Sequence, residues 1–337
     1  VEVGVRWAGA SIHTSSWRWS MPGAPRAGGS ACRSTDGWVC ADTGGLISIC
    51  SMATIALLGT GLLGEAIGHR LLSQGCHLRV WNRNPQRCQG LLEAGAKPIA
   101  HLSEGAAAGC STVITVLRDG PVTQAVVREL GDLRGGCLMP MGTMGITEIR
   151  DLADQVQHQN GHCLEAPVLG SKPQALKGEL LVMAGGESGL FDQQRPLLEH
   201  LSQEPMLVGP IGSGAATKLA LNQLIASLTH AFSLSLRLVQ QAGVPVETFM
   251  AILRPSALYA PTFDKKLQRM LDGHYDDPNF STALLRKDLR LFLEEATAAG
   301  LQIQGLLGLD TLLEQASGGE LDGLDYCALH ELTQSDP

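Results

Sequence analysis

The chain has 337 residues, of which 44% are hydrophobic and 17% are charged, and this balance excludes a disordered chain and leaves room for two domains. Its net charge of −8 argues against a nucleic-acid-binding surface, and no apolar run reaches the length of a membrane span. The nine cysteines show no CxxC pair and no metal-ligand spacing with histidine, so we expect reduced cysteines, no metal site and a cytoplasmic protein.

Residues 1–52 differ from the rest of the chain. They hold most of the tryptophans, with many Gly, Ser, Arg and Pro residues and no apolar periodicity. Met52 stands just before the first predicted strand, so we interpret residues 1–52 as a disordered or artefactual extension ahead of a natural start. A transit peptide is the alternative, because the segment is rich in Ser and Arg and poor in acids. A signal peptide is excluded, because its cleavage would remove residues 55–58, which the first strand needs.

Short apolar segments alternate with amphipathic segments between residues 53 and 212. The apolar segments predict strands and the amphipathic ones predict helices, a pattern typical of a doubly wound parallel sheet of the Rossmann type. The predicted strands are residues 54–58, 78–81, 113–117, 137–139, 162–165, 180–184 and 205–208. The predicted helices are residues 63–73, 85–93, 121–129, 146–159 and 187–201.

The strand pattern stops after residue 212, and residues 213–337 are predicted to form an all-helical domain for substrate binding and dimerisation. Residues 215–241 show one unbroken helical pattern of about seven turns at 3.6 residues per turn. Such a helix is long enough to link the two domains. The remaining predicted helices are residues 245–253, 262–271, 281–299, 303–315 and 326–333.

A glycine motif, GTGLLG, joins the first predicted strand to the first predicted helix. In such a unit Gly59 allows the tight turn, Gly61 lets the backbone approach a diphosphate, and Gly64 lets the helix pack on the strand. The helix N-terminus adds free N–H groups and a partial positive charge. The motif therefore predicts a dinucleotide site made by Gly59, Thr60, Gly61, Leu62, Leu63 and Gly64.

The residues after the second predicted strand favour NADP over NAD. An NAD site usually places an acid there to accept hydrogen bonds from the ribose 2′-hydroxyl, whereas a 2′-phosphate needs a guanidinium. This chain has Asn82 and Arg83 at that point, and no acid lies between residues 78 and 92. We therefore expect NADPH to be preferred, with NAD as the alternative if Arg83 is only a solvated charge in a loop.

Lys218 and Asn222 lie four residues apart near the start of the long helix, so they share one face of it. When hydride adds to a carbonyl, negative charge develops on the oxygen. An ammonium group held at that oxygen can stabilise the charge and donate the proton. Leu219, Ala220 and Leu224 beside them are apolar, which predicts a low-dielectric environment and a shifted lysine pKa.

Four segments, in this order and spacing, resemble the β-hydroxyacid dehydrogenase family, whose members include 3-hydroxyisobutyrate dehydrogenase and glyoxylate/succinic semialdehyde reductase. They are GTGLLG at residues 59–64, EAPVLGS at 165–171, GPIGSGAATKLALN at 209–222 and LRKD at 285–288. The resemblance covers essentially Met52 to the C-terminus. It implies that Lys218 is the catalytic lysine, assisted by Asn222.

The resemblance also implies roles for residues outside the glycine motif. Gly170 and Ser171 correspond to the segment that anchors the substrate acid, although Leu169 replaces the usual serine and one donor is lost. Thr143 is the remaining hydroxyl of a usual Ser-Thr pair and is assigned to substrate or cofactor, with a helix N-cap as the alternative. Three residues are assigned to the cofactor site: Val116, Leu117 and Lys287, the last paired with Asp288. Packing in the core is the alternative for Val116 and Leu117, and an ion pair on the helix surface is the alternative for Lys287 and Asp288.

These features predict an NADP(H)-dependent reductase of a short aldehyde acid or hydroxy acid, similar to glyoxylate or succinic semialdehyde. An NAD-linked 3-hydroxyisobutyrate-type dehydrogenase is the alternative. An imine reductase usually lacks the catalytic lysine, and retention of Lys218 and Asn222 argues against a catalytically silent binding module. The expected partners are a small carboxylic acid and further copies of the chain in a homodimer or homotetramer, with neither nucleic acid nor a membrane.

Overall fold

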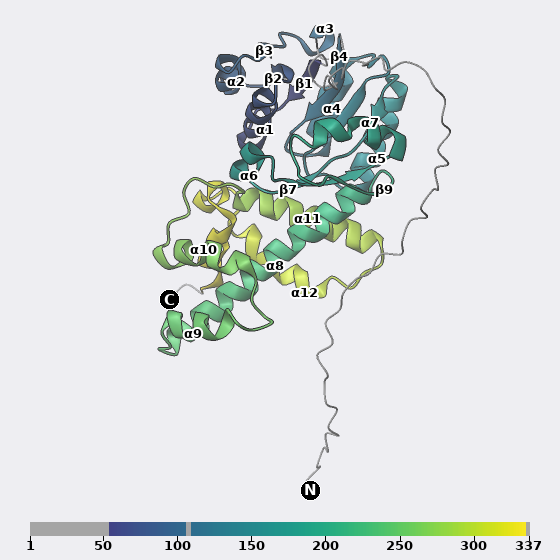
Figure 1. Cartoon of the computed structure of the whole chain (residues 1–337). Helices are drawn as coiled ribbons and strands as arrows, with labels where there is room; N and C mark the ends of the chain where they lie inside the picture. Colours follow the sequence, from purple (N-terminus) through teal and green to yellow (C-terminus); the bar gives the residue numbers. More distant parts are fainter. Residues whose placement is uncertain (1–53, 106–108, 335–337) are drawn as a thin grey trace, which may run out of the picture. The chain divides into compact units, whose positions relative to one another are not determined.

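The computed structural model describes residues 54–105 and 109–334, and all of them belong to one compact unit (Figure 1). The predicted extension at residues 1–52 lies outside the described residues, so its interpretation stays a prediction.

A six-stranded parallel sheet forms the centre of the N-terminal half. Its strands are β1 (Thr54–Leu58), β2 (His77–Trp81), β3 (Lys97–Pro98), β4 (Cys110–Thr115), β5 (Cys137–Pro140) and β6 (His162–Cys163). The spatial order is β3-β2-β1-β4-β5-β6, with Leu58 opposite Trp81 on one side and Thr115 on the other. This is the Rossmann order, in which the strand order reverses between β1 and β4 and ligands bind at the carboxyl ends of those strands.

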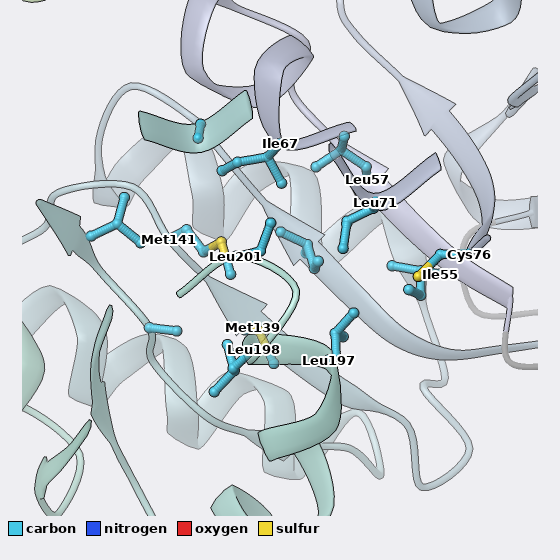
Figure 2. Packing of buried hydrophobic residues seen from close by; sticks show 14 of the residues in the cluster. Ile55, Leu57, Ile67, Leu71, Cys76, Met139, Met141, Leu197, Leu198 and Leu201 are labelled. Atoms are coloured by element: carbon cyan, nitrogen blue, oxygen red, sulfur yellow. The ribbon is translucent and has the colours of Figure 1, made fainter. Parts of the chain in front are cut away.

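Helices cover both faces of this sheet, because the residues of β1 alternate between two hydrophobic clusters. Ile55 and Leu57 belong to one cluster, and Ala56 and Leu58 belong to the other. The first cluster, which Figure 2 shows, includes side chains of α1 (Leu62–Ser73), α6 (Lys172–Lys177) and α7 (Ser188–Leu198). The second includes side chains of α3 (Leu102–Gly105), α4 (Gly120–Leu130) and α5 (Ile146–His158). The short elements η2 (Pro85–Cys88) and α2 (Gln89–Glu93) follow β2.

The last predicted strands do not extend the parallel sheet, which corrects that part of the prediction. They form a separate three-stranded sheet in which β8 (Leu181–Gly185) pairs antiparallel with β7 (Val168–Leu169) and parallel with β9 (Met206–Gly209). The predicted strand at 162–165 ends at Cys163, because the backbone of Glu165 pairs with Gly185 instead. The predicted strand at 113–117 is displaced likewise, since β4 ends at Thr115.

The C-terminal half is helical and is built around α8 (Ser213–Gln241), which packs along α11 (Thr282–Ala298) and η4 (Tyr326–Thr333) and also contacts β8 and β9 (Figure 1). Around these lie α9 (Val246–Leu253), α10 (Pro261–Asp272), α12 (Gln304–Glu314) and η3 (Glu320–Gly323). A third hydrophobic cluster joins them, with Phe232 stacked on Phe263 at 4.5 Å between ring centroids. Residues 326–333 form a 3-10 helix.

By length and composition alone, α8 is apolar enough to cross a membrane, so the expectation that no apolar run reaches that length is wrong for this helix. Its packing against α11, η4, β8 and β9 gives a second reason for the apolar composition. Apolar side chains on a helix that crosses a domain interior are buried by neighbouring elements without a bilayer.

Candidate active site

The glycine turn between β1 and α1 can be formed only by glycines at two of its positions. Gly59 has a φ of +100°, and a Cβ atom there would lie 2.3 Å from the carbonyl oxygen of Val116. A Cβ atom on Gly64 would lie 2.0 Å from the carbonyl oxygen of Gly59. Both distances are far below van der Waals contact, so the predicted reasons for glycine at these two positions agree with the geometry.

The start of α1 is open and uncapped, as an anion site requires. Its N-cap residue is Gly61, no side chain caps the helix, and a Cβ atom on Gly61 would meet nothing within 4 Å. The N–H groups of the first turn are therefore available to a diphosphate. The residues present thus fit the dinucleotide that the sequence predicts.

The other predicted cofactor-binding residues, in the glycine turn and after β2, differ in burial and in their contacts. Thr60 is buried, and its backbone N–H donates to Oδ1 of Asn82 at 3.3 Å, which ties the turn to the end of β2. Leu62 is exposed, whereas Leu63 packs against the first hydrophobic cluster. Arg83 is exposed and has no hydrogen bond or ion pair with any described residue, so its guanidinium is free to meet a ligand.

The ends of β4 and β5 close in on the turn. The backbone N–H of Val116 donates to Leu58 at 2.9 Å, and the Leu117 side chain lies 2.9 Å from the position of a Cβ atom on Gly59. Gly142 leaves room for the Leu117 carbonyl, which a Cβ atom there would approach to 2.5 Å. Val116 and Leu117 therefore lie beside the glycine turn, and their contact with the cofactor stays a prediction.

A chain of polar contacts connects the end of β5 to α11 and α8. Lys287 donates from Nζ to the Thr143 carbonyl at 3.1 Å and pairs with Oδ1 of Asp288 at 2.6 Å. Asp288 is 2% exposed, and its Oδ2 accepts a hydrogen bond from Nδ2 of Asn222 at 2.5 Å. Oδ1 of Asn222 is buried without a partner among the described residues, so it can accept a hydrogen bond from a ligand or from Lys218.

The Lys218 ammonium lies in this environment with a lowered pKa. Burial lowers the pKa of Lys218 from 10.5 to about 8; the charge of Asp288 opposes this and that of Lys287 adds to it. Nζ of Lys218 forms no hydrogen bond or ion pair with the described residues. The predicted shift is therefore present, and burial is its main cause, as expected. The exposed Ala220 and Leu224 do not provide that burial, and the charges of Asp288 and Lys287 come from α11.

The predicted substrate-acid segment is folded on itself. Gly170 is exposed with a φ of +140°, and Ser171 caps α6. The backbone N–H and the hydroxyl of Ser171 both donate to Oε1 of Gln174, at 3.0 and 2.5 Å. A substrate carboxylate would have to replace Gln174 at these donors, and no hydrogen bond or ion pair of the described residues joins Gly170 or Ser171 to Lys218. Their assignment to substrate stays a prediction.

Sequence reasoning missed two partners that the fold supplies. Asp288 was grouped with Lys287 at the cofactor, but its hydrogen bond goes to Asn222, which is 66 residues away in the sequence. Gln174 received no role, although the pattern Ser-x-x-Gln after a loop is a capping-box signal that predicts its contact with Ser171. Within residues 54–105 and 109–334, no group of three or more His, Cys, Asp or Glu side chains could hold a metal ion.

The geometry defines a class of protein. A parallel sheet in Rossmann order, an uncapped glycine turn at its switch point and a lysine with lowered pKa on the adjoining helix are the parts of a dinucleotide-dependent oxidoreductase. Residues 54–209 match the model of the NAD binding domain of 6-phosphogluconate dehydrogenase. Residues 212–333 match the model of the NAD-binding domain of NADP-dependent 3-hydroxyisobutyrate dehydrogenase. The chain belongs to the β-hydroxyacid dehydrogenase family and is an NAD(P)-dependent dehydrogenase or reductase.

The chain is similar to a reductase, to a nuclear factor and, in its fold, to a dehydrogenase. Glyoxylate/succinic semialdehyde reductase 1 of Arabidopsis thaliana is 28% identical over 282 residues, which are 82% of this chain and 97% of that protein. Cytokine-like nuclear factor N-PAC of Homo sapiens is 28% identical over 242 residues, 70% of this chain and 43% of that protein. The structure of Mycobacterium tuberculosis 3-hydroxyisobutyrate dehydrogenase with L-serine has a TM-score of 0.76 at 22% identity, covering 84% of this chain and all of that one. At that identity the structural match supports the fold alone.

Proposed function

We propose that this protein reduces a short aldehyde acid or keto acid with NADPH, and that Lys218 is the general acid. The observation that carries the proposal is the Lys218 ammonium, which has a pKa of about 8 and no hydrogen-bond partner among the described residues. A group with that pKa is protonated in much of the population at neutral pH and still gives up its proton readily.

The chain's own residues supply the binding and the proton. The uncapped first turn of α1 holds the diphosphate, and Arg83 meets the 2′-phosphate. Bound NADPH supplies the hydride. Lys218 donates its proton to the carbonyl oxygen, and its positive charge stabilises the negative charge that develops there. The unpartnered Oδ1 of Asn222 accepts a hydrogen bond from the product hydroxyl or from the Lys218 ammonium and so orients it.

The proposed substrate class rests on the relatives and on the segment at residues 165–171. Two curated relatives from Arabidopsis thaliana, 28% and 26% identical, are glyoxylate/succinic semialdehyde reductases. Gly170 and Ser171 would bind the substrate carboxylate through backbone and hydroxyl donors once Gln174 moves away. Leu169 supplies no hydroxyl at its position, so we propose that a less polar or bulkier acid is accepted as well.

We also propose that the chain forms a homodimer or homotetramer through its helical part. Leu224, Leu234 and Leu238 on α8 are 50%, 46% and 68% exposed, an amount of apolar surface on one helix that another copy could cover.

Light scattering should report a multiple of the monomer mass. The double variant Leu234→Glu, Leu238→Glu should lower the measured mass, whereas Leu181→Glu on β8 should leave it unchanged. A monomer at micromolar concentration would contradict the proposal.

Removal of the Lys218 amine should abolish most of the turnover. Lys218→Ala is expected to lower kcat for aldehyde-acid reduction by roughly two to four orders of magnitude, because the proton donor and its charge are both lost. The dissociation constant for NADPH should change little, because the diphosphate lies at α1. Lys177→Ala, at an exposed position of α6, is the control. Near-normal kcat in Lys218→Ala would refute the general-acid assignment.

The cofactor preference should depend on Arg83. The double variant Asn82→Asp, Arg83→Ala removes the guanidinium and adds a ribose acceptor. A charge-assisted contact contributes roughly 1.5–3 kcal/mol, so the ratio of kcat/KM for NADPH to that for NADH should fall about tenfold or more. Arg128→Ala, which removes an exposed arginine of α4, should leave the ratio unchanged. An unchanged ratio in the double variant would show that the 2′-phosphate binds elsewhere.

The pH dependence of reduction should follow Lys218. The protonated form is the active one, so kcat/KM for reduction should be constant at lower pH and should fall as the pH rises through about 8. The Asp288 carboxylate favours the charged ammonium, so Asp288→Asn should move this break to lower pH. The measurement is the pH profile of kcat/KM for both proteins. A break that stays in place or rises in Asp288→Asn would contradict the assignment.

A further inference from the structure

Glu165 is a buried carboxylate that the proposed chemistry does not use. It is 1% exposed and follows β6, in the segment that leads to β7. Its Oε1 accepts hydrogen bonds from the backbone N–H groups of Gly212 at 2.6 Å and Gly214 at 3.0 Å. Its Oε2 accepts one from Ala215 at 2.9 Å. The side chain thus connects the N-terminal half to the first turn of α8.

These contacts replace a cap that α8 lacks. The N-cap residue of α8 is Gly212, and no side chain caps it locally. The first N–H groups of a helix have no partner within the helix, and they carry its partial positive charge. Glu165, located 47 residues earlier in the sequence, satisfies three of these donors with a negative charge. Burial raises the pKa of the Glu165 carboxyl, whereas the three N–H groups and Arg150 oppose that rise by stabilising its charged form.

The surroundings are shaped to fit this carboxylate. A Cβ atom on Gly185 would lie 2.1 Å from Oε1 of Glu165, and one on Gly214 would lie 2.5 Å from the Met183 carbonyl. The backbones of Glu165 and Gly185 exchange hydrogen bonds at 3.1 and 2.9 Å, which fixes the residue on β8. The contact is therefore rigid on both sides.

Lys218 lies one helical turn after Gly214, and Asn222 lies one turn after Lys218. The height and rotation of this part of α8 therefore set where the ammonium lies relative to the end of the sheet. We propose that Glu165 is a positioning residue. It holds the first turn of α8 against β8 and so keeps Lys218 aligned with the substrate carbonyl. The inference rests on the proposed role of Lys218 as general acid.

The variant that tests this is Glu165→Gln, which keeps the size and shape of the side chain. The single amide oxygen of Gln cannot accept hydrogen bonds from all three N–H groups. Its NH₂ group must face at least one of them, and two donors cannot form a hydrogen bond with each other. A displacement of about 1 Å at a catalytic group can cost a factor of about 100 in rate. We expect kcat to fall by roughly 10- to 100-fold. The NADPH dissociation constant, measured by fluorescence, should stay within about twofold, because α1 is untouched.

Arg237→Gln is the matched control for a purely structural effect. Arg237 also secures α8, donating to the His330 carbonyl at 2.7 and 3.1 Å, but it lies about 28 Å from Lys218 along the helix at 1.5 Å per residue. Both variants should lower the thermal unfolding midpoint, and only Glu165→Gln should lower kcat. If both variants lose kcat in proportion to lost stability, or Glu165→Gln keeps its kcat, the proposal is overturned.

A double-mutant cycle with Lys218→Ala separates this proposal from the general-acid proposal. If Glu165 acts through Lys218, adding Glu165→Gln to Lys218→Ala should change the residual kcat by less than about twofold. A full additional loss would show that Glu165 acts by another route and would overturn the positioning role. Near-normal kcat in Lys218→Ala alone refutes the general acid instead. If Glu165→Gln does not fold, Glu165→Asp takes its place, because it keeps the charge on a side chain that is shorter by one CH₂ group. An unchanged kcat in that variant overturns the proposal.

Discussion

The buried carboxylate of Asp288 couples the two halves of the molecule. It accepts a hydrogen bond from Asn222 on α8 and pairs with Lys287, which in turn donates to the Thr143 carbonyl after β5. A buried carboxylate is unfavourable unless such donors surround it, so α8, α11 and the end of β5 are held in one arrangement. The same charge partly offsets the effect of burial on the Lys218 ammonium, which would otherwise have a still lower pKa. The pKa of Lys218 and the packing of the two halves therefore both depend on Asp288.

The two halves contribute separate functions at the edge of the sheet. The N-terminal half provides the glycine turn, the uncapped first turn of α1 and the free Arg83, all of which suit an anionic dinucleotide. The helical half provides Lys218, for which we propose the role of proton donor, and the unpartnered Asn222 oxygen. Carboxylates control both junctions between them, with Asp288 on the α11 side and Glu165 at the start of α8. A reductase needs its hydride donor and its proton donor at fixed positions relative to one carbonyl, and these two junctions would supply that constraint.

The sequence predicted the features that depend on neighbours along the chain and missed those that depend on distant ones. The apolar runs and the GTGLLG spacing predicted the parallel sheet, the glycine turn and the long helix, because periodicity and backbone strain are local properties. β7 was missed because a two-residue strand has no readable alternation, and β8 and β9 were predicted as strands but assigned to the wrong sheet, because strand pairing depends on distant residues. The contacts of Asn222 with Asp288 and of Glu165 with α8 join residues 66 and 47 to 50 positions apart, and only the fold brings these together. Exposure of Ala220 and Leu224 shows that apolar neighbours on a helix do not by themselves indicate burial.

The protonation of Lys218 itself is the most direct test of this account. The titration can be followed by heteronuclear NMR of lysine side chains labelled with ¹³C and ¹⁵N, with the Lys218 signal assigned by comparison with Lys218→Ala. The account predicts that this signal titrates with a pKa of about 8 and that Asp288→Asn lowers it further. A Lys218 that titrates near 10.5, the ordinary value for lysine, would contradict the account, because burial would then not lower the pKa of its ammonium.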